Sequence, residues 1–115
     1  MNFGKYIKFS DDPLCDDLSD LMQEGIENYL CHGLSPGGFL TAVLANDLMS
    51  AASRADHWNK TRIVPIAKWI LHNAPAASFG SYEKVNSWCK DVDYQRSSWF
   101  DPIEKKFMWE ILTKA

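Results

Sequence analysis

Apolar residues recur at helical spacing in five segments of the chain. The first predicted helix covers residues 12–32, because Asp12 is a capping residue and Pro13 suits the first helical position. Gly33 supplies the left-handed residue with which many helices end. The apolar stripe of this segment is Leu14, Leu18, Leu21, Met22, Ile26, Tyr29 and Leu30.

Two longer helices are predicted in the middle of the chain. Residues 36–54 form the first, with Ser35 as its cap and Pro36 at its first position. Asp56 is predicted to cap the next, over residues 57–74, which Pro65 must kink or divide. The predicted core positions of the two helices are Phe39, Leu40, Val43, Leu44, Leu48 and Met49, then Ile63, Ile66, Ala67, Trp69, Ile70 and Leu71.

The remaining segments complete an all-α fold class, a compact bundle of about five helices with short loops. Ser81 is expected to cap a short helix over residues 82–90, and Asp101-Pro102 to begin a last one. We interpret the chain as a single helical domain, 1–115. Residues 1–11 are an N-terminal arm, 12–90 the core, and 91–115 a connector and C-terminal helix.

Composition excludes several classes of function. An apolar fraction of 46% is enough for a core, and a net charge of −3 argues against duplex DNA as a partner. No stretch approaches the about 20 apolar residues of a membrane span, and the first residues lack the apolar core of a signal peptide. We therefore expect a cytoplasmic protein with no membrane partner.

Neither metal nor catalytic chemistry is indicated. The three cysteines include no CxxC pair, so we expect reduced thiols and no metal site. The sequence contains no GxSxG, HExxH or phosphate-loop motif, and its three histidines lie near predicted helix ends. We therefore expect a non-enzyme with no cofactor.

The stretch "CHGLSPGGFLTAVLAND", residues 31–47, offers backbone chemistry suited to an anion. Gly37 and Gly38 lie at a predicted helix start, where amide N–H groups are unpaired and no side chain keeps a phosphate away. Ser35 and Thr41 add hydroxyl groups nearby. The alternative is that the glycines only let another helix pack closely.

Three further side chains can complete such a site. Arg54 and Arg62 supply positive charge, and Tyr29 can stack on a base. Arg54 can equally bind helix-end carbonyl groups or pair with Asp56, and Tyr29, like Trp88, can belong to the core. The candidate ligand-binding set is Tyr29, Ser35, Gly37, Gly38, Thr41, Arg54 and Arg62.

The segment from Ile26 to Lys90 resembles a family of short tailed-phage proteins with the pattern "HGIPPG-FL-AVL-NDL", then "RAD--N", then "YN-AP---GS-EKV--W". The matching residues are His32, Gly33, Pro36, Gly37, Phe39, Leu40, Ala42, Val43, Leu44, Asn46, Asp47, Leu48, Arg54, Ala55, Asp56, Asn59, Asn73, Ala74, Pro75, Gly80, Ser81, Glu83, Lys84, Val85 and Trp88. Pro65 and the predicted helix after Asp101 depart from that pattern.

This family is similar to the phage anti-CBASS sponge proteins, small helical oligomers that sequester cyclic oligonucleotide immune signals. The resemblance implies a non-enzymatic counter-defence protein, a homo-oligomer that binds a cyclic oligonucleotide in the cytoplasm of the infected host cell.

Two alternatives remain open. The first is a protein-binding inhibitor of a host enzyme or defence complex, favoured by seven acidic and no basic residues from Asp11 to Glu27 and by five tryptophans. The second is a structural or assembly factor of the virion.

Overall fold

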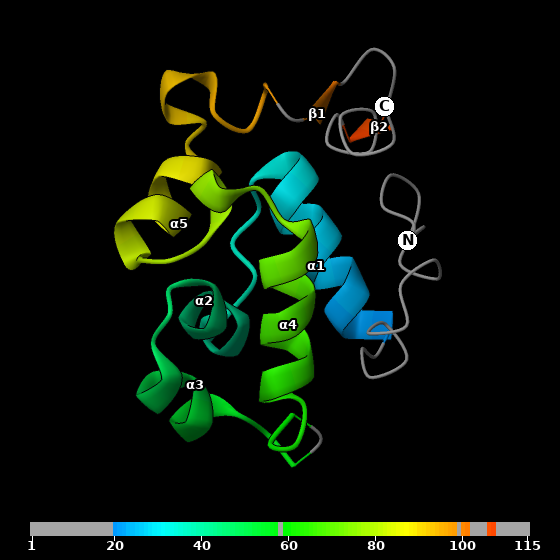
Figure 1. Ribbon diagram of the computed structural model, residues 1–115, viewed down its shortest axis with the longest axis vertical. Helices are drawn as coiled ribbons and strands as arrows, with labels where there is room; N and C mark the ends of the chain where they lie inside the picture. Colours follow the sequence, from blue (N-terminus) through cyan, green and yellow to red (C-terminus); the bar gives the residue numbers. More distant parts are fainter. Residues whose placement is uncertain (1–19, 58, 99, 102–105, 108–115) are drawn as a thin grey trace.

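The computed structural model describes residues 20–57, 59–98, 100–101 and 106–107. Within them the chain forms an all-α bundle, which confirms the predicted fold class (Figure 1). Its α-helices are α1 (Asp20–His32), α2 (Gly38–Leu44), α3 (Leu48–Arg54), α4 (Ile63–Asn73) and α5 (Tyr82–Cys89). The shorter elements are the 3₁₀ helices η3 (Ala76–Ser78) and η4 (Val92–Tyr94) and the two-residue strands β1 (Phe100–Asp101) and β2 (Lys106–Phe107).

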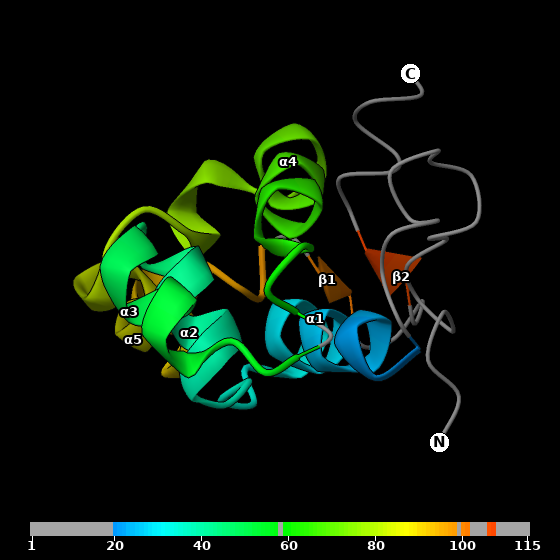
Figure 2. The same ribbon diagram turned by 90° about the horizontal axis from the view of Figure 1, so that it is seen from below.

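The core lies where α1, α2, α4 and α5 converge (Figures 1 and 2). Its buried members are Ile26, Tyr29, Leu30, Cys31, Leu40, Leu44, Ala45, Ile66, Trp69, Ile70, Val85 and Trp88. The Tyr29 hydroxyl donates a hydrogen bond of 2.6 Å to the Ser78 carbonyl, and Trp88 Nε1 donates one of 3.1 Å to the Tyr29 carbonyl. These bonds join α1 to η3 and α5 through groups shielded from water.

The predicted end of the first helix is confirmed. Gly33 has φ of 68°, and its N–H donates to the Tyr29 carbonyl at 3.0 Å, as in a left-handed helix cap. Leu21 is exposed, although it belongs to the predicted core stripe. The predicted helix start at Asp12 and the N-terminal arm lie outside the described residues.

The predicted helix over residues 36–54 is two helices. The chain turns at Gly37, the N-cap of α2, whose φ of 86° favours glycine, so the predicted start at Ser35-Pro36 is wrong. A second break follows, with Asn46 at φ 62° and the Asp47 carboxylate accepting the Ser50 N–H at 3.1 Å.

This break changes which side chains of α3 face the core. The new helix does not continue the apolar stripe of α2, since it starts from its own cap. Leu48 and Met49, predicted to be buried, are exposed instead, whereas Ala51 is fully buried.

Helix α4 begins later than predicted, so that Pro65 lies in its first turn. Asp56 caps only a turn, accepting the Asn59 N–H at 2.8 Å, and Arg62 is the N-cap of the helix. Pro65 is then the third helical residue, where its missing N–H has no intrahelical partner to lose. The predicted core residues Ile66, Trp69 and Ile70 are buried, while Ala67 and Leu71 are exposed.

The last part of the chain confirms one prediction and contradicts another. Ser81 caps α5, its hydroxyl accepting the Lys84 N–H at 3.1 Å. A helix is predicted to begin at Asp101-Pro102. In the structure, Lys106–Phe107 is a strand that pairs antiparallel with Phe100–Asp101, so the prediction is wrong for these residues. Start signals do not fix a short helix, because its stability comes mostly from packing. Residues 102–105 and 108–115 lie outside the described residues.

Candidate functional site

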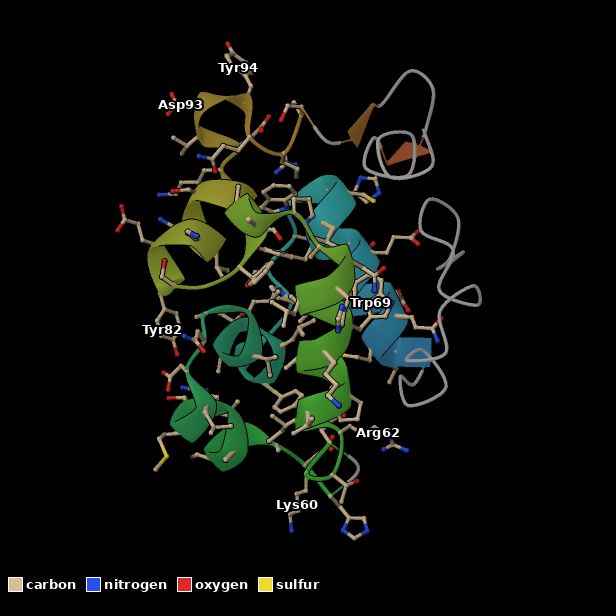
Figure 3. All side chains as sticks on the ribbon, viewed as in Figure 1. Lys60, Arg62, Trp69, Tyr82, Asp93 and Tyr94 are labelled. Atoms are coloured by element: carbon tan, nitrogen blue, oxygen red, sulfur yellow. The ribbon has the colours of Figure 1, made fainter. Side chains whose placement is uncertain are left out.

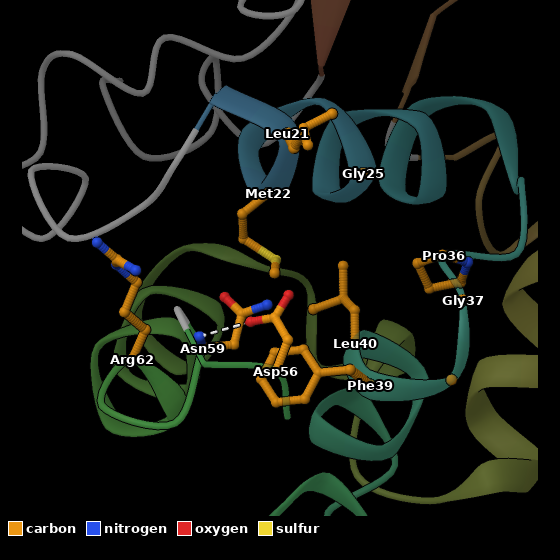
Figure 4. A pocket seen from close by; sticks show the side chains of 11 residues that line it. Leu21, Met22, Gly25, Pro36, Gly37, Phe39, Leu40, Asp56, Asn59 and Arg62 are labelled. Carbon is orange, nitrogen blue, oxygen red and sulfur yellow. Dashed lines mark hydrogen bonds between the residues drawn. The ribbon is translucent and has the colours of Figure 1, made fainter. Parts of the chain in front are cut away.

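A pocket lies between the first half of α1, the loop that leads into α2 and the turn before α4 (Figure 4). Its volume of about 430 Å³ falls within the range of roughly 300–1,000 Å³ of small-molecule sites. We call it the α1–α4 pocket, and its lining residues are Leu21, Met22, Gly25, Pro36, Gly37, Gly38, Phe39, Leu40, Asp56, Asn59 and Arg62.

The pocket combines an apolar wall with a few polar groups. Figure 4 shows Arg62 at one end and Pro36 at the other, with the Phe39 ring between them. Asp56 and Asn59 lie near the ring, held together by the 2.8 Å hydrogen bond from the Asn59 N–H. The lining of the pocket thus includes an aromatic ring, a carboxylate and an amide, with the Arg62 side chain at its edge.

The structure brings three of the seven sequence-predicted residues together, namely Gly37, Gly38 and Arg62. At Gly37 the φ of 86° calls for glycine, and no atom lies within 4 Å of the place where a Cβ would be. Its backbone therefore faces open space. Packing explains why residue 38 is a glycine, since a Cβ there would lie 2.8 Å from Arg54 Nη1.

Tyr29 is a core residue, which contradicts its predicted role in stacking on a ligand. The side chain is fully buried, and its hydroxyl is bonded to the Ser78 carbonyl. Burial, with a smaller effect of Cys89, raises the pKa of Tyr29 well above its usual range, so the phenol stays neutral.

Ser35, Thr41 and Arg54 do not line the pocket. Thr41 lies one turn into α2, with its N–H bonded to the Gly37 carbonyl at 3.0 Å. The Arg54 side chain lies against Gly38, because the break at Asn46 lets α3 fold back along α2. Packing of Arg54 on the glycine accounts for its position without a ligand.

Sequence reasoning missed the largest part of the pocket wall. Phe39 and Leu40 were assigned to the core, and Asp56 only to a helix cap. One sequence signal does point to Asp56 and Asn59. Both belong to the "RAD--N" pattern of the resemblance.

A second polar contact, away from this pocket, joins α3 to α5. The Tyr82 hydroxyl donates a 2.6 Å hydrogen bond to Asp47 Oδ2. This bond lowers the pKa of Asp47 and raises that of Tyr82. The contact has a structural explanation, because Asp47 is also the cap of α3.

In the described part of the chain, no group of three or more His, Cys, Asp or Glu side chains is placed to hold a metal ion. No helix there has the length and apolarity to cross a membrane. Comparison with protein-family models, curated proteins and solved structures gives no match.

Proposed function

We propose that this chain is a non-enzymatic phage counter-defence protein that sequesters a cyclic oligonucleotide immune signal, and that the α1–α4 pocket holds part of that signal. The observation that carries the proposal is the meeting of Gly37, Gly38 and Arg62 in one pocket. Gly37 and Gly38 are adjacent at the start of α2, whereas Arg62 comes from a separate segment, at the start of α4. The resemblance of residues 26–90 to a phage protein family supports the choice of ligand.

The pocket offers a partner for each chemical part of a nucleotide. A base stacks against Phe39, as bases do on aromatic rings in single-strand binding sites. The Asp56 carboxylate accepts hydrogen bonds from an exocyclic amino group, which favours bases that carry one. The Arg62 guanidinium pairs with the phosphate. Helix α2 has seven residues, so we assign its dipole a minor part.

The size of the pocket bears on the assembly. At about 430 Å³ it lies near the small end of ligand sites and suits one nucleotide unit of a cyclic ligand. The rest of the ligand then needs a second wall, and a second copy of the chain is the simplest source. We therefore propose a homo-oligomer, whose capacity for the signal depends on protein abundance and tight binding rather than turnover.

Calorimetric titration with a panel of cyclic di- and trinucleotides tests this function. We expect saturable binding by one or more of them, weakened at least about tenfold in Arg62→Ala, because a charge-assisted contact is lost. Lys60→Ala is the matched control, since Lys60 is exposed and does not line the pocket. Folded protein that binds no nucleotide of the panel would contradict the proposal.

Native mass spectrometry of protein purified from immune-competent bacteria separates this function from the alternative. The expected spectrum contains an oligomer with a co-purified nucleotide mass. One stoichiometric host protein in place of the nucleotide favours the protein-binding inhibitor. That alternative is supported by exposed apolar side chains on α3 and α4, outside the pocket.

A further inference from the structure

Two polar side chains of the α1–α4 pocket, Asp56 and Asn59, belong to the turn before α4. The Asn59 backbone N–H donates to Asp56 Oδ1 at 2.8 Å, which holds the two residues in a fixed relation. Figure 4 shows both side chains near the Phe39 ring. Asp56 is exposed and Asn59 is half-buried, so a ligand that enters the pocket can reach both.

The Asp56 carboxylate can accept further hydrogen bonds. An ionised carboxylate has about four lone-pair sites and no donor. Within the part of the chain that the structure describes, its one side-chain hydrogen bond is that from the Asn59 N–H to Oδ1. The second oxygen, Oδ2, and a further lone pair of Oδ1 are therefore open to a ligand.

The donors on the edge of a base decide which base fits a carboxylate. Proteins recognise unstacked bases on their Watson–Crick edge. Guanine carries two donors side by side on that edge, the N1–H and the N2 amino group, and these match the two oxygens of one carboxylate, as the guanidinium fork of arginine does. In adenine and cytosine the amino group stands beside an acceptor nitrogen, which a carboxylate oxygen repels. Uracil has a single N–H between two carbonyl groups.

We propose that the α1–α4 pocket selects guanine, with the Asp56 carboxylate accepting from N1–H and the N2 amino group and the Asn59 side-chain amide donating to O6. This inference rests on the proposed function and narrows its ligand to cyclic oligonucleotides that contain guanine. Stacking on Phe39 is available to every base, because every base has a π face. Discrimination between bases therefore belongs to Asp56 and Asn59.

Three cyclic dinucleotides test the proposed contacts one by one. Cyclic di-GMP presents both donors, cyclic di-IMP lacks only the 2-amino group, and cyclic di-AMP presents an acceptor at N1. Calorimetric titration measures the affinity of each for the full chain. We expect cyclic di-GMP to bind at least about tenfold more tightly than cyclic di-IMP, since a charge-assisted hydrogen bond is lost. Cyclic di-AMP should bind most weakly, because its N1 faces a carboxylate oxygen.

Asp56→Asn separates base recognition from the structure of the turn. An asparagine can still accept the Asn59 N–H, since Asn and Asp serve about equally well as caps. It replaces one carboxylate oxygen with an NH₂ group, which repels the N2 amino group of guanine. The preference for cyclic di-GMP over cyclic di-IMP should therefore disappear or reverse.

Asp93→Asn is the matched control for the change of charge. Asp93 is exposed and does not line the pocket, and Figure 3 shows it toward the opposite end of the molecule from Arg62. The substitution removes the same negative charge, which by itself affects all three anionic ligands alike. We expect it to leave the ratio of the affinities for cyclic di-GMP and cyclic di-IMP unchanged.

The outcomes distinguish this inference from the function on which it rests. Folded protein that binds none of the three ligands overturns the guanine inference and counts against the sequestering of cyclic dinucleotides as well. Saturable binding with equal affinity for cyclic di-GMP and cyclic di-IMP, or with tighter binding of cyclic di-AMP, overturns the inference alone. So does an Asp56→Asn variant that keeps the preference for cyclic di-GMP or loses affinity for all three ligands in equal proportion, since Asp56 then has only a structural role.

Discussion

At the scale of single residues, Gly33 lies where the ends of two helices meet. Its φ of 68° ends α1, and a Cβ built on it would lie 2.8 Å from the Cys89 carbonyl oxygen near the end of α5. Arg96 Nη1 covers the same place, donating to the Trp88 and Cys89 carbonyls at 3.1 and 3.0 Å. A cation at carbonyl groups of a helix end is favourable, and glycine leaves the space for it.

Gly33→Ala should lower the free energy of unfolding by about 2 kcal/mol or more, because the left-handed backbone and the contact with Cys89 both oppose a Cβ. Urea denaturation measures the change. Gly25→Ala is the matched control: it lies inside α1, and its Cβ would meet only Leu40 Cδ2 at 3.6 Å. We expect this variant to be neutral or more stable by about 0.5–1 kcal/mol. Equal effects of the two substitutions would contradict this account of Gly33.

Asp47 provides a test at the same scale through its pKa. The hydrogen bond from Tyr82, with smaller contributions from Ser50 and Arg54, lowers the pKa of Asp47. Tyr82→Phe should therefore move that pKa upward, toward the ordinary value of an aspartate. An NMR titration of the carboxyl carbon measures it, and an unchanged midpoint would show that the bond is absent in solution.

The same bond makes stability depend on pH in a defined direction. A group whose folded pKa lies below its unfolded value contributes stability above the unfolded pKa and loses it as the pH falls through the folded pKa. Asp47 stabilises the native chain in this way at neutral pH. Tyr82→Phe should therefore show a smaller loss of stability on acidification than the native chain.

At the scale of elements, the break between α2 and α3 is the largest departure from the hydrophobic pattern. Apolar residues continue at helical spacing through Leu44 and Leu48, so periodicity alone predicts one helix. Asn46 and Asp47 are residue types whose short polar side chains compete with the helical backbone. In this chain Asn46 takes a left-handed conformation and Asp47 caps the next helix.

Removing the cap should destabilise α3. Asp47→Ala loses the Ser50 contact and should lower the free energy of unfolding by about 1 kcal/mol. Asp47→Ser keeps an oxygen that caps the helix and should retain most of the stability. Chemical denaturation compares the two variants. Equal destabilisation would mean that the bond to Tyr82, which both lose, matters more than the cap.

At the scale of the whole molecule, a chain of buried hydrogen bonds ties distant segments together. Trp88 of α5 donates to the Tyr29 carbonyl of α1, and the Tyr29 hydroxyl donates to Ser78 of η3. The two aromatic rings are 6.4 Å apart and tilted by 38°, an arrangement that adds to their packing. Tyr29 thus belongs to the core, whatever the pocket binds.

Tyr29→Phe separates the core role from a role in ligand binding. Loss of the hydroxyl should lower the free energy of unfolding by about 1–2 kcal/mol, because the bond to Ser78 is buried. Affinity for a nucleotide ligand should be unchanged within error, measured by calorimetry below the unfolding transition. A loss of affinity with unchanged stability would show that Tyr29 contributes to ligand binding and not only to the core.

The sequence by itself determined the features that depend on neighbours a few residues apart. The helical class, the end of a helix at Gly33 and the cap at Ser81 were each predicted from residue types within one or two turns. Backbone preference and side-chain capping act over that distance, so the signal is present in a short segment.

Only the tertiary structure decided which parts of these helices meet. The packing of the helices determines which face of α4 is buried, and it leaves Leu71 exposed. It also places Tyr29 in the core. It also placed Arg62 and Gly37 at opposite ends of one pocket and set Arg54 against Gly38. Such contacts join residues far apart in the chain, and the three-residue break between Leu44 and Leu48 redirects them. Their physical cause is the fit of whole helices against one another, which local preference does not specify.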